Sequence, residues 1–182
     1  MGIIMSEMPQ VLVVEDEAEV LEDYLLNLSS DEYKLTGVRS LEDAIAALEK
    51  QKFDVVVTDL QLFNRPDGGM QVIERTKALD ATIAVIMVTA YGSESIARRA
   101  IRQLGAQGFF PKPLDFDFCR KRIHQTILER RYRLAAIEAA AQGGFVPISS
   151  PYVAGKPLGQ GSVMFYGRDE IFGFIRDRKS VV

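Results

Sequence analysis

The sequence has little that would support disulfide bonding, a cysteine-based metal cluster or insertion into a membrane. Its one cysteine, Cys119, can form neither an internal disulfide nor a metal cluster by itself. A reducing compartment is therefore expected, and we predict a cytoplasmic protein. No apolar run approaches the roughly 20 residues that span a bilayer. The start of the chain lacks the basic and apolar regions of a secretory signal, and we predict that residues 1–9 are disordered.

A large excess of charge of one sign is also absent. The 182 residues include 22 basic and 25 acidic side chains, which gives a formal net charge of −3. Such a balance implies no strongly basic surface, so we do not expect nucleic-acid binding. The chain is 47% hydrophobic and 26% charged, which is typical of a globular domain and too apolar for a disordered one.

Short aliphatic runs alternate with segments of helical periodicity. The runs predict buried strands at Val11–Val14, Lys34–Val38, Val55–Val57, Ile83–Val88 and Gln107–Phe110. The segments between and after them predict helices at Ala18–Leu28, Leu41–Leu48 (capped by Ser40), Met70–Leu79, Ser93 or Ser95 to Leu104, and Phe116–Gln142. Strands that are each followed by a helix predict an α/β fold, a doubly wound five-stranded parallel sheet of the flavodoxin-like type.

Polar residues follow four of the predicted strands, at the sheet edge where such folds bind ligands. Glu15 and Asp16 follow the first strand, Asp59 the third, Thr89 the fourth and Lys112 the fifth. Three neighbouring carboxylates repel one another and would gather a hard cation such as Mg²⁺, beside which one of them could act as a nucleophile. Each residue alone could be an ordinary turn or surface group. All five at one edge favour a binding site.

Four segments carry a family resemblance. Leu12-Val13-Val14-Glu15-Asp16, Val57-Thr58-Asp59, Val88-Thr89-Ala90 and Phe110-Pro111-Lys112-Pro113 look like the corresponding parts of the receiver domain of bacterial response regulators. They fall in the family's order and close to its spacing. The resemblance covers about residues 10–130, which we predict to be a receiver domain.

The resemblance implies a site that binds a metal ion and accepts a phosphoryl group. Asp59 would be the phosphoacceptor, and a histidine kinase or a histidine phosphotransfer protein would be the donor. Mg²⁺ would be bound by Asp16, by Glu15 directly or through water, by Asp59 and by the backbone carbonyl of Gln61. Such a domain is not an enzyme in the ordinary sense, since it catalyses only its own phosphorylation and dephosphorylation.

The resemblance also implies a conformational switch. Lys112 and Thr89 would contact the phosphoryl oxygens, and Phe109 would turn inward as Thr89 moves. The surface of the fourth helix, the fifth strand and the fifth helix would then change. A plain core position is the alternative for Phe109, because the neighbouring Phe110 could equally be the buried ring.

The chain departs from the family pattern around the acidic residues. Phe63 stands where the family usually carries a proline, and Asp67-Gly68 are displaced by one residue. The family pattern therefore does not define the conformation of this loop or the metal contact of Gln61. The acid pair is Glu-Asp, and Tyr91 follows Thr89 by two residues, where its ring could shield a phosphoryl group or lie on the surface.

The last predicted helix is longer than a receiver domain needs. Its apolar residues form a heptad-like stripe from Ile123 onward, which Arg130 interrupts. Arg130 is also counted among the outer basic residues, with Arg120, Lys121, Arg122, Arg131 and Arg133. Residues 131–144 are expected to be either a solvated linker or a helix that pairs two chains in a homodimer. The single histidine, His124, is expected on the surface or the dimer face and not as a phosphodonor.

Residues 145–182 are expected to be an irregular tail. The stretch Phe165-Tyr166-Gly167-Arg168-Asp169-Glu170 is similar to the segment that opens many signalling P-loop ATPase modules. The tail is thus interpreted as the start of a truncated effector domain. The chain contains no Gly-x-x-x-x-Gly-Lys-Ser/Thr motif, so we do not expect it to hydrolyse ATP.

Other classes of function compete with the phosphoacceptor. A receiver fold that ignores phosphate and serves as an interaction or dimerisation module is the main alternative, and magnesium binding would distinguish the two. A haloacid dehalogenase-type phosphohydrolase would need an acid where Gln61 stands. A flavodoxin-like cofactor protein would need a phosphate-binding loop after the first strand, and the sequence has none there.

Overall fold

The computed structural model of the chain describes residues 7–62, 65, 68–89 and 101–141. Contacts divide the chain into two compact units, Met1–Ala135 and Ala136–Val182. Some predictions concern residues outside these ranges. They are the disordered start before residue 7, most of the helix expected to begin at Ser93 or Ser95, the position of Tyr91, and the tail.

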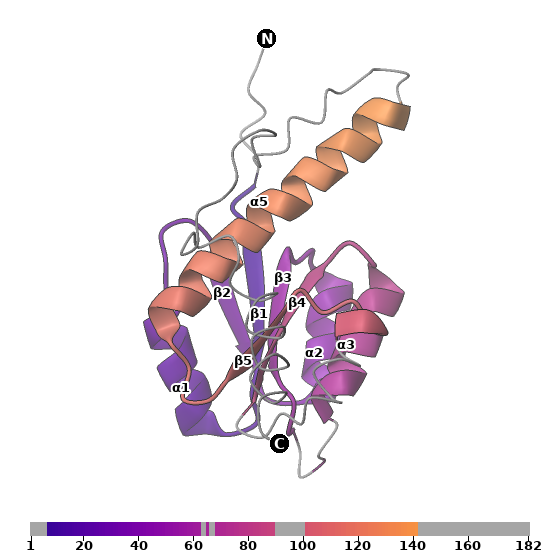
Figure 1. The fold of residues 1–182 in the computed structure, drawn as a ribbon. Coiled ribbons are helices and arrows are strands. Elements are labelled where there is room, and N and C mark those ends of the chain that lie inside the picture. Colours follow the sequence, from indigo (N-terminus) through magenta and orange to yellow (C-terminus); the bar gives the residue numbers. More distant parts are fainter. Residues whose placement is uncertain (1–6, 63–64, 66–67, 90–100, 142–182) are drawn as a thin grey trace, which may run out of the picture. The chain divides into compact units, whose positions relative to one another are not determined.

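The described residues form one parallel sheet of five strands. The strands are β1 (Gln10–Val14), β2 (Lys34–Val38), β3 (Val55–Asp59), β4 (Ala84–Thr89) and β5 (Gly108–Pro111). Their order is β2-β1-β3-β4-β5, and every neighbouring pair is parallel (Figure 1). The predicted five-stranded parallel sheet is confirmed. The carboxyl ends of all the strands consequently lie along the same edge.

Helices cover both faces of the sheet. They are α1 (Ala18–Asn27), α2 (Leu41–Lys50), α3 (Gly68–Leu79) and α5 (Phe116–Ala141). Figure 1 shows α1 and α5 on one face and α2 and α3 on the other. Ser40 caps α2 as predicted, since its side-chain oxygen accepts a hydrogen bond of 2.9 Å from the backbone N–H of Asp43. No helix among the described residues is long and apolar enough to cross a membrane.

Two hydrophobic clusters hold the helices to the sheet, because successive side chains of a strand point to opposite faces. Along β1, Leu12 and Val14 pack with α2 and α3, whereas Val11 and Val13 pack with α1 and α5. The strands β3 and β4 are buried along their whole length. Such burial explains why these segments are continuous aliphatic runs and do not alternate with polar residues.

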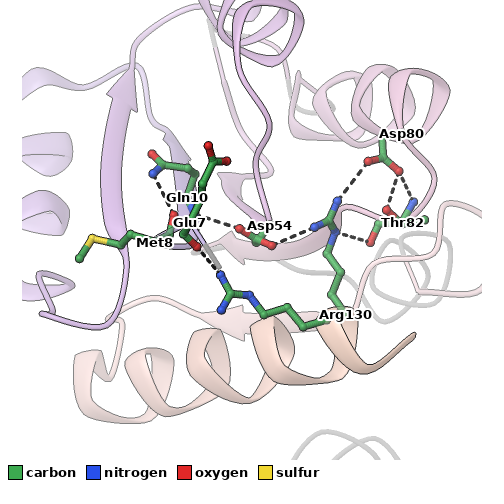
Figure 2. Close-up of polar contacts among 8 residues, drawn as sticks. Glu7, Met8, Gln10, Asp54, Asp80, Thr82 and Arg130 are labelled. Carbon is green, nitrogen blue, oxygen red and sulfur yellow. Dashed lines mark hydrogen bonds and ion pairs between the residues drawn. The ribbon is translucent and has the colours of Figure 1, made fainter. Parts of the chain in front are cut away.

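Helix α5 is joined to the sheet through Arg130, and its placement corrects the prediction of an outer basic residue. The side chain of Arg130 is buried, with 9% of the residue exposed. Its guanidinium donates to the carboxylates of Asp54 and Asp80 and to the backbone carbonyl of Thr82, as Figure 2 shows. The apolar stripe is interrupted there because an ionic contact with the loops before β3 and β4 replaces an apolar one.

Candidate functional site

The strand ends bring the predicted site residues to one edge of the sheet. Glu15 directly follows β1, Asp59 and Thr89 are the last residues of β3 and β4, and Lys112 directly follows β5. The β-sheet register places Asp59 beside Val88, the neighbour of Thr89. The backbone N–H of Lys112 donates to the carbonyl of Thr89 at 2.9 Å. The spatial meeting of these four residues was predicted from the sequence.

Lys112 lies between two buried carboxylates. Its Nζ is 2.7 Å from Oδ2 of Asp59 and 3.1 Å from Oε2 of Glu15. Glu15 is 1% exposed and Asp59 is 6% exposed. Burial raises the pKa of Glu15, and the ammonium of Lys112 opposes that shift. Burial by itself would lower the pKa of Lys112, but its hydrogen bond with Asp59 and the attraction of nearby anions hold that pKa above its usual range.

A tyrosine ring lies near the same ammonium. Tyr24, on α1, is buried, and its ring centroid is 5.8 Å from Nζ of Lys112, a cation–π distance. Burial raises the pKa of Tyr24 to about 12, so its phenol stays protonated at neutral pH. Tyr24 falls inside the helix predicted at Ala18–Leu28 and was not among the predicted site residues. Tyr24 and Lys112 are far apart in the chain, and nothing in the sequence indicates that they are in contact.

The loop that follows Asp59 is packed tightly against α3. The backbone N–H of Gln61 donates to Oδ1 of Asp59 at 3.1 Å, and that of Gly69 donates to the carbonyl of Leu60 at 2.9 Å. A Cβ atom on Gly69 would lie 1.9 Å from the carbonyl oxygen of Asp59. Glycine is therefore required at this position. Residues 63–64 and 66–67 lie outside the described residues, so the predicted departures at Phe63 and Asp67 are not tested.

The loop between β1 and α1 carries Asp16. Arg39, directly after β2, donates from Nε and Nη2 to the backbone carbonyl of Asp16, at 3.1 and 2.9 Å. The N–H of Glu17 donates to Oε1 of Glu15 at 3.3 Å. Arg39 was missed by the sequence analysis, although it occupies a strand end like the other site residues.

The two phenylalanines of β5 pack on opposite faces of the sheet. Phe109 contacts the cluster on the α2 and α3 side, and Phe110 contacts the cluster on the α1 and α5 side. Phe110 also packs edge-to-face on Phe118, with ring centroids 5.4 Å apart. Both Phe109 and Phe110 are half-buried. The role of Phe109 in a switch therefore stays a prediction.

The residues of the site fit a divalent cation in donor type and charge. Glu15 and Asp59 reach the same ammonium, so their carboxylates share one small region with a net charge of about −1 when both are ionised, before Asp16 is counted. Carboxylate and carbonyl oxygens are the ligands that Mg²⁺ prefers. Within the described part of the chain, no three carboxylate, imidazole or thiol side chains already form a metal-binding group. Binding would require rearrangement around Lys112, or backbone and water ligands.

A family model matches most of the described fold. The model of the response regulator receiver domain matches residues 11–124. The matched segment runs from β1 into α5 and includes the site residues at all four strand ends. The similar segments noted in the sequence therefore reflect a match along the whole domain.

Curated relatives resemble the chain over a part of their own length. The transcriptional regulatory protein ZraR of Salmonella typhimurium is 27% identical over 140 residues, which is 77% of this chain and 31% of ZraR. GlrR, a transcriptional regulatory protein of Escherichia coli, is 32% identical over 114 residues, which is 62% of this chain and 25% of GlrR. The chain thus spans about a third or less of the length of these relatives.

Solved structures show the same fold. A signal receiver domain of a LuxO repressor protein from Vibrio parahaemolyticus has a TM-score of 0.64 and 27% sequence identity, and the match covers 70% of this chain and 96% of that one. A response regulator receiver domain protein from Clostridium thermocellum has a TM-score of 0.62 at 23% identity, covering 68% of this chain and 97% of that one. Both matches extend over nearly the whole of the solved domains.

Proposed function

The chain belongs to the response regulator receiver domain family, and we propose that Asp59 is the residue on which it accepts a phosphoryl group. Domains of this family are signalling phosphoacceptors of two-component systems and not classical enzymes. The observation that carries the assignment to Asp59 is its contact with Lys112, at 2.7 Å. A carboxylate that ends a central strand beside a fixed ammonium is placed to attack phosphorus while the ammonium balances charge on the phosphoryl oxygens.

The proposed transfer step uses this geometry. The donor is a phosphohistidine of a histidine kinase or a histidine phosphotransfer protein. A carboxylate oxygen of Asp59 forms the new bond to phosphorus as the bond from phosphorus to the donor nitrogen breaks, and the imidazole leaves with the electron pair and takes up a proton. Lys112 and the hydroxyl of Thr89 then contact the phosphoryl oxygens. Hydrolysis by water returns Asp59 to the carboxylate, so phosphorylation and dephosphorylation are both catalysed by the domain itself.

Magnesium is proposed as the cofactor of this step. Asp16, Glu15, Asp59 and the backbone carbonyl of Gln61 would hold it, and it would neutralise charge on the phosphoryl group. The support is the concentration of negative charge described above, where the buried carboxylates of Glu15 and Asp59 reach the same ammonium. Receiver domains generally bind Mg²⁺ at their acidic phosphorylation site.

The output is proposed to be a change on the surface formed by β5, α5 and the segment before β5. Thr89 moves toward the phosphoryl oxygens, and Phe109 takes the space that it leaves. On α5, the large apolar side chains of Leu128 and Tyr132 are exposed, which supports a homodimer formed through this helix. The relatives of the chain are transcriptional regulators more than twice as long, so an effector domain controlled by the receiver is part of the proposal.

The test is the intact mass of the protein after incubation with acetyl phosphate, with and without Mg²⁺. We expect one phosphoryl adduct that appears only with Mg²⁺ and is absent from the Asp59→Asn variant, which keeps the size of the side chain. No adduct, together with no binding of Mg²⁺, would contradict the proposal. The chain would then be a receiver-shaped interaction module.

A further inference from the structure

Arg39 joins the end of β2 to the loop that carries Asp16. The nitrogens Nε and Nη2 of its guanidinium both donate to the backbone carbonyl oxygen of Asp16, at 3.1 and 2.9 Å. One residue earlier on each strand, the N–H of Glu15 donates to the carbonyl of Val38 at 3.2 Å. The parallel pairing of β1 and β2 is thus continued by a side chain beyond the last strand residue.

Helix α1 begins directly after this loop, at Ala18. The N-cap of this helix is Glu17, whose side chain makes no capping hydrogen bond. The N–H of Glu17 is held by the carboxylate of Glu15, a group that is itself proposed to bind the metal. Asp16 lies between these two residues. Arg39 holds the Asp16 backbone through its carbonyl and leaves the carboxylate oxygens of the site available as metal ligands.

We propose that Arg39 is a positioning residue for magnesium binding, which holds the Asp16 backbone in the conformation from which its carboxylate binds the metal. The inference rests on the proposed function, since it concerns the metal step of that site. Arg39 touches neither the metal nor the phosphoryl group. It acts through the carbonyl of Asp16.

The guanidinium has two separable effects on the affinity for a divalent cation. Its planar fork fixes the loop, which favours binding, whereas its positive charge beside the acidic pocket opposes binding. A lysine keeps the charge but lacks the fork, and a glutamine lacks the charge. The two substitutions therefore separate positioning from electrostatics. Arg39 is exposed, so neither substitution leaves a cavity in the core.

The experiment is a calorimetric titration of the whole chain with MgCl₂, without a phosphodonor. We compare the unaltered protein with Arg39→Lys, Arg39→Gln and a control, Lys50→Gln, which removes an exposed positive charge at the end of α2. Both Arg39 variants are expected to bind Mg²⁺ about threefold to tenfold more weakly, the range that corresponds to the net value of one ordinary hydrogen bond. The control is expected to stay within twofold of the unaltered protein, and all variants are expected to keep its thermal midpoint.

The outcomes distinguish this inference from the proposed function. If the unaltered chain binds Mg²⁺ and Arg39→Lys binds it equally well, or if Arg39→Gln binds it more tightly, Arg39 acts only through its charge and the positioning role is wrong. If the unaltered chain binds no Mg²⁺, the metal step of the proposed function fails and the role of Arg39 fails with it. Hydrogen exchange at the amides of Asp16 and Glu17 gives a second readout, which should become faster in both variants of Arg39.

Discussion

The guanidinium Nη1 of Arg130 lies 2.8 Å from Oδ1 of Asp54, so helix α5 is joined to the residue that precedes β3. The other carboxylate oxygen of Asp54 accepts a hydrogen bond of 3.0 Å from the backbone N–H of Gln10, the first residue of β1 (Figure 2). Asp54 thus links α5 to two central strands at the edge opposite the acidic pocket. Both side chains of the ion pair are largely buried, with 10% and 15% exposure.

The first prediction follows from this ion pair. Arg130→Met keeps the length of the apolar stem but leaves the carboxylate of Asp54 without its counter-ion. Breaking a buried pair in this way costs about 3 kcal/mol of the free energy of unfolding. Urea denaturation would measure the loss. The matched control is Arg133→Met on the exposed side of the same helix, where the change should stay within about 0.5 kcal/mol. A loss below about 1 kcal/mol for Arg130→Met would contradict a stabilising role for the pair.

The second prediction concerns acid stability and Asp80. Partial burial would raise the pKa of Asp80, but hydrogen bonds from Thr82 and the nearby Arg130 outweigh it and lower the pKa below the ordinary value of 3.8. A carboxyl with a lowered pKa in the folded state stabilises the fold above its unfolded pKa. The stabilisation disappears as the pH falls through the folded pKa.

Asp80→Asn should therefore reduce stability at neutral pH and have little effect at the acid end. The measurement is the thermal midpoint of both proteins between neutral pH and strongly acid pH. The difference in midpoint should be constant above the ordinary pKa of an aspartate and shrink below it. A difference that stays the same throughout would show that the charge of Asp80 contributes nothing.

The third prediction concerns the packing of Gly69 on the phosphoacceptor. A methyl group at this position would meet the carbonyl oxygen and carbon of Asp59, at 1.9 and 2.8 Å. Gly69→Ala must therefore displace the backbone of Asp59 or the start of α3, at a cost of about 1–3 kcal/mol. We expect lower stability and a phosphorylation rate reduced at least tenfold.

Gly105 provides the comparison for this variant. It has a positive φ of 69°, so Gly105→Ala also strains the backbone, but the nearest atom to its added Cβ is Cε of Lys77 at 3.7 Å, an ordinary van der Waals distance. We expect Gly105→Ala to lower the stability of the fold. Under conditions in which the variant is folded, its phosphorylation rate should equal that of the unaltered protein. Equal phosphorylation by Gly69→Ala and the unaltered protein would show that the contact with Asp59 does not position it.

The fourth prediction uses the single cysteine. Cys119, on α5, is fully buried in the cluster that joins this helix to the sheet, and burial raises the pKa of its thiol to about 12. Only the thiolate reacts with disulfide reagents, so the folded protein should react very slowly at neutral pH. The rate should rise with urea in parallel with unfolding. Complete modification of the folded protein within minutes would show that α5 separates from the sheet readily.

The fold and the edge of the sheet that carries the candidate site were predictable from the sequence because they depend on patterns that are local in the chain. A buried parallel strand is a continuous apolar run, and the residue after it is at the ligand-binding edge whatever the tertiary details. Glu15, Asp59, Thr89 and Lys112 were identified in this way, and they lie at one edge of the sheet. Their roles in metal binding and phosphorylation stay predictions. Because side chains alternate along a strand, Phe109 and Phe110 must lie on opposite faces of the sheet. The alternation does not indicate which of the two rings would turn in the proposed switch.

The contacts that the sequence analysis missed join residues far apart in the chain. Arg130 was assigned to the helix surface together with the other basic residues of the helix, and nothing local indicates Asp54 as its partner. Arg39 was missed for a similar reason, since its partner is a backbone carbonyl, which carries no sequence signature. Tyr24 is a core residue inside a predicted helix, but its ring also lies near the ammonium of Lys112, which comes from the other end of the domain.

The measurement that tests the central claim most directly locates the phosphoryl group. After incubation with acetyl phosphate and Mg²⁺, borohydride reduces an aspartyl phosphate to homoserine, and peptide mass spectrometry identifies the position. Trypsin places Asp59 on a different peptide from Glu15 and Asp16, because Lys34 and Lys52 lie between them. Homoserine at position 59 alone is the predicted result. Reduction at Glu15 or Asp16, or an adduct that survives in Asp59→Asn, would contradict the assignment of Asp59 as the phosphoacceptor.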